Sequence, residues 1–116
     1  MVLGKNMDHL MTLAKERMLR LEDIGLIGAE PDEVKRFCND IARKLVECYL
    51  AQELPWSDGD AIANHYFQLM IEDCGREMPS YAWDVFLAFD EGEIDGRGDA
   101  FTRERVLKLH SEYGYA

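Results

Sequence analysis

Residues 31–50 read PDEVKRFCNDIARKLVECYL, and this stretch decides the fold class. Its apolar residues recur every three or four positions, which is the period of one face of an α-helix. The predicted buried stripe comprises Val34, Phe37, Cys38, Ile41, Leu45, Cys48 and Tyr49. Pro31 suits the first turn of a helix, and the acidic residues Asp32 and Glu33 interact favourably with the helix dipole there. The pattern predicts a helix from Pro31 that is closed by Pro55. Its predicted solvent face comprises Lys35, Arg36, Asn39, Asp40, Arg43, Lys44 and Glu47.

The segment before this helix has the same apolar spacing. Asn6 or Asp8 can cap a helix that runs to about Asp23, and the glycines at 25 and 28 permit the left-handed conformation in which many helices end. The buried stripe of this helix is predicted to comprise Met7, Leu10, Met11, Ala14, Met18, Leu21 and Ile24.

A third helix is predicted after Pro55. Ser57 is suited to cap it, with Asp60 three residues later as in a capping box, and Gly75 follows its last turn. Its buried stripe is predicted to comprise Ile62, Tyr66, Leu69 and Met70.

Two more helices are predicted in the last third of the chain. Pro79 and Ser80 begin a segment that is apolar nearly all round, which is typical of a helix in the middle of a fold. A loop rich in glycine and acidic residues is predicted at 90–100. Thr102 is then expected to cap the last helix, with Phe101 forming a hydrophobic staple before it.

Strand signals are nearly absent from the sequence, since no run of alternating β-branched residues and no Asn-Gly hairpin occurs. No internal repeat or long linker divides the chain. A length of 116 residues fits one domain with a core of its own. The predicted fold is therefore all-α: a single helical domain over residues 1–116, built as a compact bundle of about five helices.

The formal net charge is −10, and it is distributed unevenly. Residues 1–50 hold nine acidic and eight basic residues, whereas residues 51–116 hold fourteen acidic and five basic residues. Phosphate backbones repel such a surface, so we expect no nucleic-acid binding. A basic protein partner fits the charge, although acidity can also serve solubility alone.

The three cysteines, Cys38, Cys48 and Cys74, show no Cys-x-x-Cys spacing, and the first two fall inside apolar helical patterns. No apolar run reaches the roughly 18 residues that a membrane span requires, and no signal peptide is recognised at the start. We therefore expect a cytoplasmic protein that does not bind membranes.

No cofactor or metal site is recognised. Residues 90–99 are superficially similar to a calcium-binding EF-hand loop, but Thr102 stands where that loop needs a bidentate glutamate. Nucleotide-binding and nucleophile-elbow motifs are absent as well. We expect no cofactor and no enzyme activity. The alternative is a small enzyme with a dispersed site, for which His65, Asp60 and Cys74 are the candidates.

Two features remain as candidates for function. One is an acidic stretch, predicted to bind a partner through Asp84, Asp90, Glu91, Glu93, Asp95 and Asp99. The other is a set of aromatic residues that can anchor an interface within a charged rim, although core packing explains some of them equally well: Trp56, Tyr81, Trp83, Tyr113 and Tyr115.

Residues 83–94, which read WDVFLAFDEGEI, resemble a segment of small acidic bacterial immunity-type proteins. The resemblance covers about a tenth of the chain. It implies a toxin inhibitor that captures a basic toxin domain in one-to-one fashion through an acidic face.

The sequence therefore predicts a non-catalytic protein-binding module, of an inhibitor or immunity type, that captures a basic protein partner. Besides the small enzyme, a second alternative is a regulatory or chaperone-like helical domain that forms a homodimer through an exposed apolar helix face.

Overall fold

The computed structural model describes residues 7–24, 30–73, 79–94 and 98–114 of the chain. Helices and connecting turns account for these residues, and no strand occurs among them. The five α-helices are α1 (Met7–Lys15), α2 (Pro31–Leu50), α3 (Trp56–Gln68), α4 (Ser80–Gly92) and α5 (Gly98–Glu112). Two short segments complete the fold, the 3₁₀ turn η1 (Leu21–Ile24) and the π-helical η2 (Leu69–Asp73), which continues α3. The predicted all-α bundle of about five helices is confirmed.

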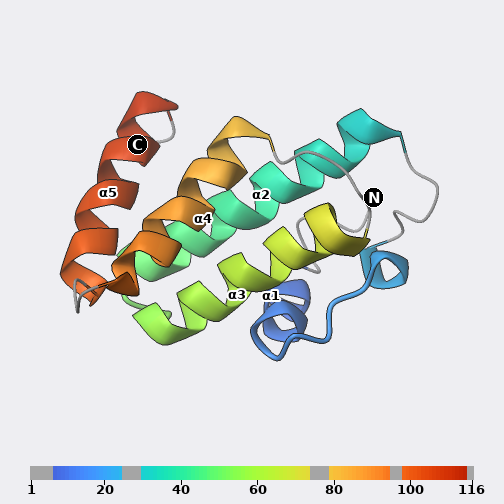
Figure 1. The fold of residues 1–116 in the computed structure, drawn as a ribbon, viewed down its shortest axis with the longest axis horizontal. Coiled ribbons are helices and arrows are strands. Elements are labelled where there is room, and N and C mark those ends of the chain that lie inside the picture. Colours follow the sequence, from blue (N-terminus) through green and yellow to red (C-terminus); the bar gives the residue numbers. More distant parts are fainter. Residues whose placement is uncertain (1–6, 25–29, 74–78, 95–97, 115–116) are drawn as a thin grey trace.

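Helices α2 and α4 form the middle of the bundle. Helix α4 packs against α2, α3 and α5, and α2 contacts all four other α-helices. In Figure 1, the axes of α2, α3 and α4 are roughly aligned, with α3 running opposite to α2 and α4, while α5 crosses at one end of the molecule and α1 lies beneath α3. The Cα radius of gyration is 13.2 Å, close to the roughly 13 Å expected of a globular chain of this length.

One apolar core unites the helices. The largest fully buried side chains in it come from different helices and include Phe37, Tyr49, Tyr66, Tyr81 and Phe89. Helices α3 and α4 approach closely because Gly59 lacks a Cβ, which would lie 2.6 Å from the ring of the fully buried Phe89. No helix within the described ranges combines the length and apolarity that crossing a membrane demands.

The predicted first helix ends earlier than expected. Arg17 adopts the left-handed conformation (φ 61°). The amides of Arg17 and Met18 bond to Ala14 O and Leu13 O, at 3.0 and 2.8 Å. These are the two hydrogen bonds of a Schellman motif, which satisfies carbonyls at a helix end. Met18, predicted to be buried, is 61% exposed in consequence.

Helix α2 ends in the same way, at Leu50 and not at Pro55. Gln52 is left-handed (φ 62°), and its amide bonds to Tyr49 O at 3.1 Å while that of Glu53 bonds to Cys48 O at 2.9 Å. Pro55 instead stands directly before α3, as Pro79 does before α4, both in extended conformation. Ser57, predicted to cap α3, lies within its first turn, and the N-cap residue is Pro55, which makes no side-chain hydrogen bond to the helix.

Outside residues 95–97, which the structure does not describe, the acidic loop predicted at 90–100 is largely helical. Asp90, Glu91 and Gly92 form the last turn of α4, and α5 already begins at Gly98. Thr102 is therefore an interior residue of α5 and not its cap, and Phe101 does not precede the helix. The two glycines allow the close junction: a Cβ at Gly92 would lie 2.3 Å from Thr102 Oγ1, and Gly98 is left-handed (φ 57°).

Candidate functional site

The six acidic residues predicted to bind a partner lie in different surroundings. Two of them, on the side of α4 that faces α5, have partners within the fold. Arg105 Nη2 donates to Glu91 Oε1 at 2.8 Å, and Tyr113 donates its hydroxyl hydrogen to Asp84 Oδ2 at 3.0 Å. Their charge is thus offset locally or engaged by a hydroxyl group.

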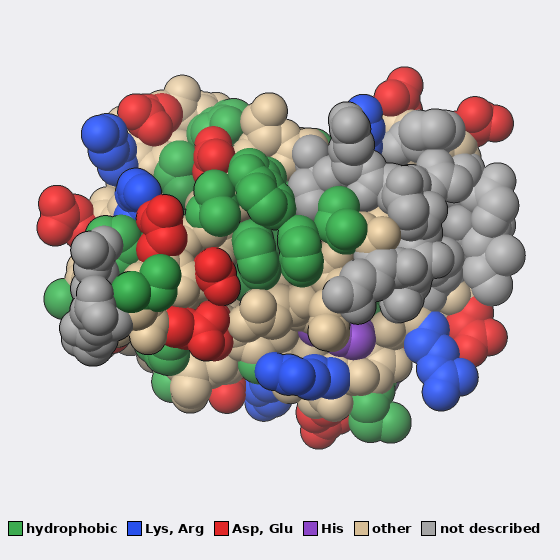
Figure 2. Space-filling view, in the orientation of Figure 1, with side chains coloured by type: hydrophobic (Ala, Val, Ile, Leu, Met, Phe, Trp, Pro, Cys, Tyr) green, Lys and Arg blue, Asp and Glu red, His purple; other side chains and the backbone are tan. Residues whose placement is uncertain are grey.

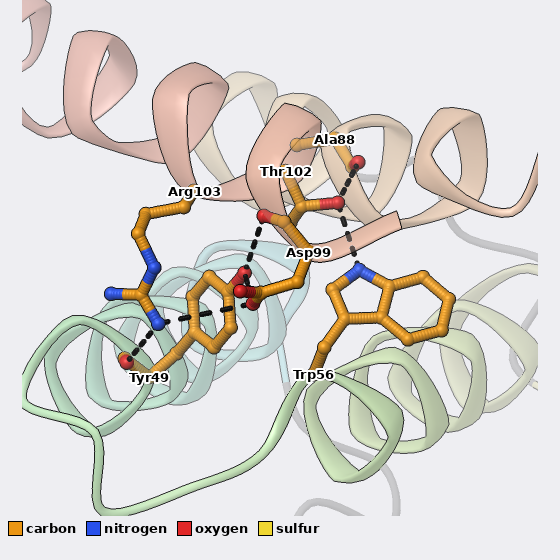
Figure 3. Close-up of polar contacts among 6 residues, drawn as sticks. All are labelled: Tyr49, Trp56, Ala88, Asp99, Thr102 and Arg103. Carbon is orange, nitrogen blue, oxygen red and sulfur yellow. Dashed lines mark hydrogen bonds and ion pairs between the residues drawn. The ribbon is translucent and has the colours of Figure 1, made fainter. Parts of the chain in front are cut away.

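Asp99 belongs to a polar junction at the other end of α5 (Figure 3). The Tyr49 hydroxyl donates to Asp99, to its main-chain oxygen at 3.0 Å and to its carboxylate. Arg103 lies 3.8 Å from the same carboxylate and 4.6 Å from the centre of the Tyr49 ring. Burial, followed by the hydrogen bond to Asp99 and the charge of that carboxylate, raises the pKa of Tyr49 well above its usual value.

The same junction continues to α3 and α4 through Thr102. Trp56 Nε1 donates to Thr102 Oγ1 at 2.9 Å, and this hydroxyl donates in turn to Ala88 O at 2.9 Å. Thr102 is fully buried, so its hydroxyl joins three helices where water has no access. A wide, open depression of about 710 Å³ lies beside the junction, along residues 52–57 with Asp99 and Arg103. We assign this end of the molecule a structural role.

Asp90 and Glu93 lie at the other side of α4, facing α3, and Asp60 of α3 completes this acidic group. Glu93 and Asp90 both lie close enough to Asp60 to act on its carboxyl group. Asp60 Oδ1 is buried without a hydrogen-bond partner. No lysine or arginine of the described ranges forms an ion pair with these three residues.

This arrangement changes the acidity of Asp60. Burial, then the charge of Glu93 and the hydrogen bond with it, and the charge of Asp90 raise the pKa of Asp60 to about 7, against a smaller opposing effect of Asn64. Near pH 7 the carboxyl group of Asp60 is therefore only partly ionised.

Aromatic side chains lie next to this acidic group. The rings of Phe67 on α3 and Phe86 on α4 are stacked, with centroids 4.3 Å apart and planes 9° apart. Trp83 packs on Phe86 with centroids 5.5 Å apart and is 38% exposed, and Ile71 nearby in sequence on η2 is 37% exposed. Exposed aromatic surface of this kind is typical of binding interfaces.

A groove of about 410 Å³ joins the two features. Phe67 and Phe86 line it, as do Asp90 and Glu93, with Arg17, Asn64 and Gln68. Figure 2 shows hydrophobic side chains gathered over α3 and α4 on this face, with acidic side chains beside them toward the end of α4. We call this surface, made of Phe67, Ile71, Trp83, Phe86, Asp90, Glu93 and Asp60 behind them, the α3–α4 face.

The structure thus brings together two of the six predicted residues, Asp90 and Glu93. Asp84, Glu91 and Asp99 lie elsewhere, and Asp95 lies outside the described residues. Of the aromatic candidates, Trp83 belongs to the face, while Trp56 and Tyr81 pack inward, Tyr113 packs on Tyr81, and Tyr115 is not described. We did not predict Phe67 and Phe86 as interface residues. Phe67 is apolar but lies off the predicted buried stripe of α3, and this mismatch could have indicated an exposed binding residue.

The described residues of the alternative enzyme site, His65 and Asp60, do not lie together. His65 is buried, and its Nε2 lies 2.9 Å from Leu19 O, which can only accept, so Nε2 carries the hydrogen. Its Nδ1 is buried without a partner. Five positions separate it from Asp60, which is about 140° around the helix. Cys74 lies outside the described residues.

Across residues 7–24, 30–73, 79–94 and 98–114, no group of three or more His, Cys, Asp and Glu side chains could hold a metal ion. In comparisons with known proteins, no family model, no curated protein and no solved structure matches the chain.

Proposed function

We propose that this protein is a non-catalytic binding module that captures a basic segment of a partner protein on the α3–α4 face. The observation that carries the proposal is the meeting of the partly exposed rings of Phe67 and Trp83 with carboxyl groups that form no ion pair among the described residues, although Arg17 lines the same groove. Aromatic anchors supply desolvated contact area, and the acidic rim selects positive charge.

The net charge of −10 acts in the same direction at longer range. It attracts a cationic partner before contact, and it disfavours nucleic acid and other polyanions. Residues 83–94, which resemble immunity-type proteins, supply Trp83, Phe86, Asp90 and Glu93 of the face. We therefore infer an inhibitory role in the cytoplasm, in which capture covers a surface that the basic partner needs for its own activity.

A homodimer through the same face is disfavoured by charge. Two copies that met symmetrically over Trp83 would bring two sets of Asp90 and Glu93 toward each other, and like charges across an interface cost several kcal/mol. Sedimentation at about 50 µM tests this point, because a stable dimer would reverse the assignment.

The binding test compares two charge reversals of equal size. Asp90→Lys/Glu93→Lys acts on the face, and Glu104→Lys/Glu112→Lys acts on exposed positions of α5. Each variant captures proteins from the source organism, and a basic protein retained by the wild type is then purified and its binary affinity measured. We expect the first variant to lose at least ten-fold in affinity and the second to lose less than three-fold.

Loss of capture cannot be confused with loss of folding. Lysine at 90 and 93 removes the repulsion that acts on Asp60, so the first variant should be at least as stable as the wild type. Equal affinities of the two variants would overturn the proposal, as would a captured partner that is acidic.

A further inference from the structure

The groove of the α3–α4 face has two chemically different walls. Phe67, partly exposed with the buried Phe86 behind it, offers ring surface, and Asp90 and Glu93 offer carboxylate oxygens. Arg17, Asn64 and Gln68 complete the lining, and Arg17 forms no ion pair with either carboxylate. A cation with a flat or aliphatic surface can contact both walls at once, because it stacks on the rings while its charge meets the carboxylates. Neutral or anionic groups would satisfy only one wall and leave the carboxyl groups unpaired.

The carboxyl groups are not all ionised when the groove is empty. Asp60 does not line the groove, but Glu93, which does, lies close enough to raise the pKa of Asp60. The groups that face Asp60 are Glu93 and Asp90 from α4 and Asn64 from its own helix, whose Nδ2 donates to Asp60 O at 2.9 Å. The segment after α1 contributes Arg17 to the groove wall, and α2 presents the apolar Leu45 beside Gly59.

We propose that the groove seats an arginine side chain of the protein partner, and that its guanidinium pairs with Asp90 and Glu93 and thereby releases the proton held by Asp60 behind them. The proton leaves its carboxyl oxygen for the solvent, the electron pair of the O–H bond stays on that oxygen, and no other bond changes. This inference rests on the proposed function and names the group that the acidic rim recognises.

Arginine fits the groove better than lysine does for geometric reasons. Its guanidinium is planar, stacks on aromatic rings and donates in a fork that matches carboxylates, whereas the lysine ammonium is a compact and strongly hydrated charge. Arginine also stays fully charged at every pH at which proteins are handled. A change of affinity with pH therefore reports on the protein and not on the ligand.

Binding should be linked to proton release. The free protein holds the proton up to a pH of about 7, and the bound guanidinium lowers the pKa of Asp60. Because the bound state then holds fewer protons, affinity must rise with pH up to about 7 and level off above it. One released proton gives at most about a ten-fold change in affinity per pH unit.

The test uses a hexa-arginine peptide as probe and follows the amide and indole signals of the protein by NMR at pH 5.5, 6.5 and 7.5. We expect saturable shifts at the Trp83 indole and a dissociation constant about ten-fold lower at pH 7.5 than at pH 5.5. Asp60→Asn, which keeps the shape but has no proton to release, should bind with little pH dependence. Hexa-lysine should bind more weakly than hexa-arginine.

The outcomes separate the two proposals. No binding of hexa-arginine to the α3–α4 face at any pH would overturn both this inference and the proposed function. Binding at Trp83 that is independent of pH, or that depends on pH equally in Asp60→Asn, would overturn this inference and leave the proposed function standing. Equal affinity for hexa-lysine would overturn the assignment of arginine.

Discussion

At the scale of single residues, the roles of a few side chains depend on neighbours that are far away in the sequence. Asp60 was expected to help cap its own helix, but its carboxyl group lies close to that of Glu93, 33 positions later, which raises its pKa. Thr102 was expected to cap α5, but its hydroxyl links Trp56 to Ala88. In both cases a polar side chain that local rules assign to a helix end takes part in a tertiary contact.

Asp60→Asn should stabilise the protein at pH 8. The folded pKa of Asp60, about 7, lies above the value of roughly 3.9 in an unfolded chain, so the folded state binds the proton more tightly. The associated stability is fully present below about pH 4 and is lost as pH rises through about 7. We expect the variant to gain about 1 kcal/mol at pH 8, an amount reduced by solvent screening, in urea unfolding.

The matched control for this variant is Asp58→Asn, two residues earlier on α3. Asp58 lies 4.0 Å from Lys15, so removing its charge loses a weak ion pair and should cost up to about 1 kcal/mol. A loss of stability at pH 8 in Asp60→Asn as well would show that the Asp60 carboxylate is satisfied in the folded protein.

Thr102→Val tests the buried hydroxyl of the junction. The valine has nearly the same shape, but it leaves Trp56 Nε1 without its acceptor and Ala88 O without its donor. We expect a loss of about 2 kcal/mol in the free energy of unfolding. Thr102→Ser, which keeps the hydroxyl and deletes a methyl group, should lose only about 1 kcal/mol. The reverse order would assign the role of Thr102 to packing.

At the scale of helices, the ends are set by means that short sequence motifs do not reveal. Both α1 and α2 end in Schellman motifs whose left-handed residue is Arg17 or Gln52, and neither is glycine. Helix α4 receives a cap from another helix, because Asn39 Oδ1 accepts a hydrogen bond from Ala82 N at 3.1 Å. Helix ends in this fold are thus partly products of tertiary packing.

Asn39→Ala should destabilise the protein although Asn39 was assigned to the solvent face of α2. The substitution leaves Ala82 N, one of the amides that have no partner within α4, without its acceptor. We expect a loss of about 1 kcal/mol in chemical unfolding. Asn39→Asp keeps an acceptor near a helix N-terminus and should stay within about 0.5 kcal/mol of the wild type. Equal losses in the two variants would contradict a capping role.

Gln52→Gly should stabilise the end of α2. A residue with a side chain costs about 1 kcal/mol in the left-handed conformation, and glycine removes most of this cost while loosening the unfolded chain. The net expectation is a gain of about 0.5 kcal/mol, measured by thermal unfolding. Ala51→Gly, at a right-handed position (φ −79°) next to it, should lose stability instead. A gain in both variants would point to a cause other than the backbone conformation.

At the scale of the whole molecule, excess negative charge opposes the compact state. The formal net charge is −10, and the ion pairs among the described residues involve mostly half-exposed side chains that contribute little. Repulsion among like charges therefore outweighs local attraction at low ionic strength. The same repulsion is concentrated at the α3–α4 face, where Asp60 retains a proton.

Salt should accordingly stabilise the folded protein. Raising NaCl from 20 to 300 mM shortens the screening length from about 20 Å to below 10 Å. We expect the free energy of unfolding to rise by about 1 kcal/mol or less in urea titrations. Asp60→Asn should respond less than the wild type, since one source of repulsion is absent. A fall in stability with salt would mean that the ion pairs dominate.

The sequence by itself determined the helical class and most of the core. The stripes of α2 and α3 and the apolar α4 follow from spacing alone, because burial of an apolar face depends on a period of 3.6 residues that neighbours in sequence create. The predicted stripe residues Val34, Phe37, Ile62, Tyr66 and Met70 are all buried. The excess of acidic over basic residues in residues 51–116 also follows from the sequence alone.

Only the tertiary structure decided where the candidate site lies. Asp90 and Glu91 are neighbours in sequence, yet a turn of about 100° per residue sends one toward Asp60 and α3 and the other to Arg105 on α5. Whether a carboxylate is paired or left with a proton depends on which helix packs opposite it. That packing is fixed by contacts between distant segments, and no local pattern of residues encodes it.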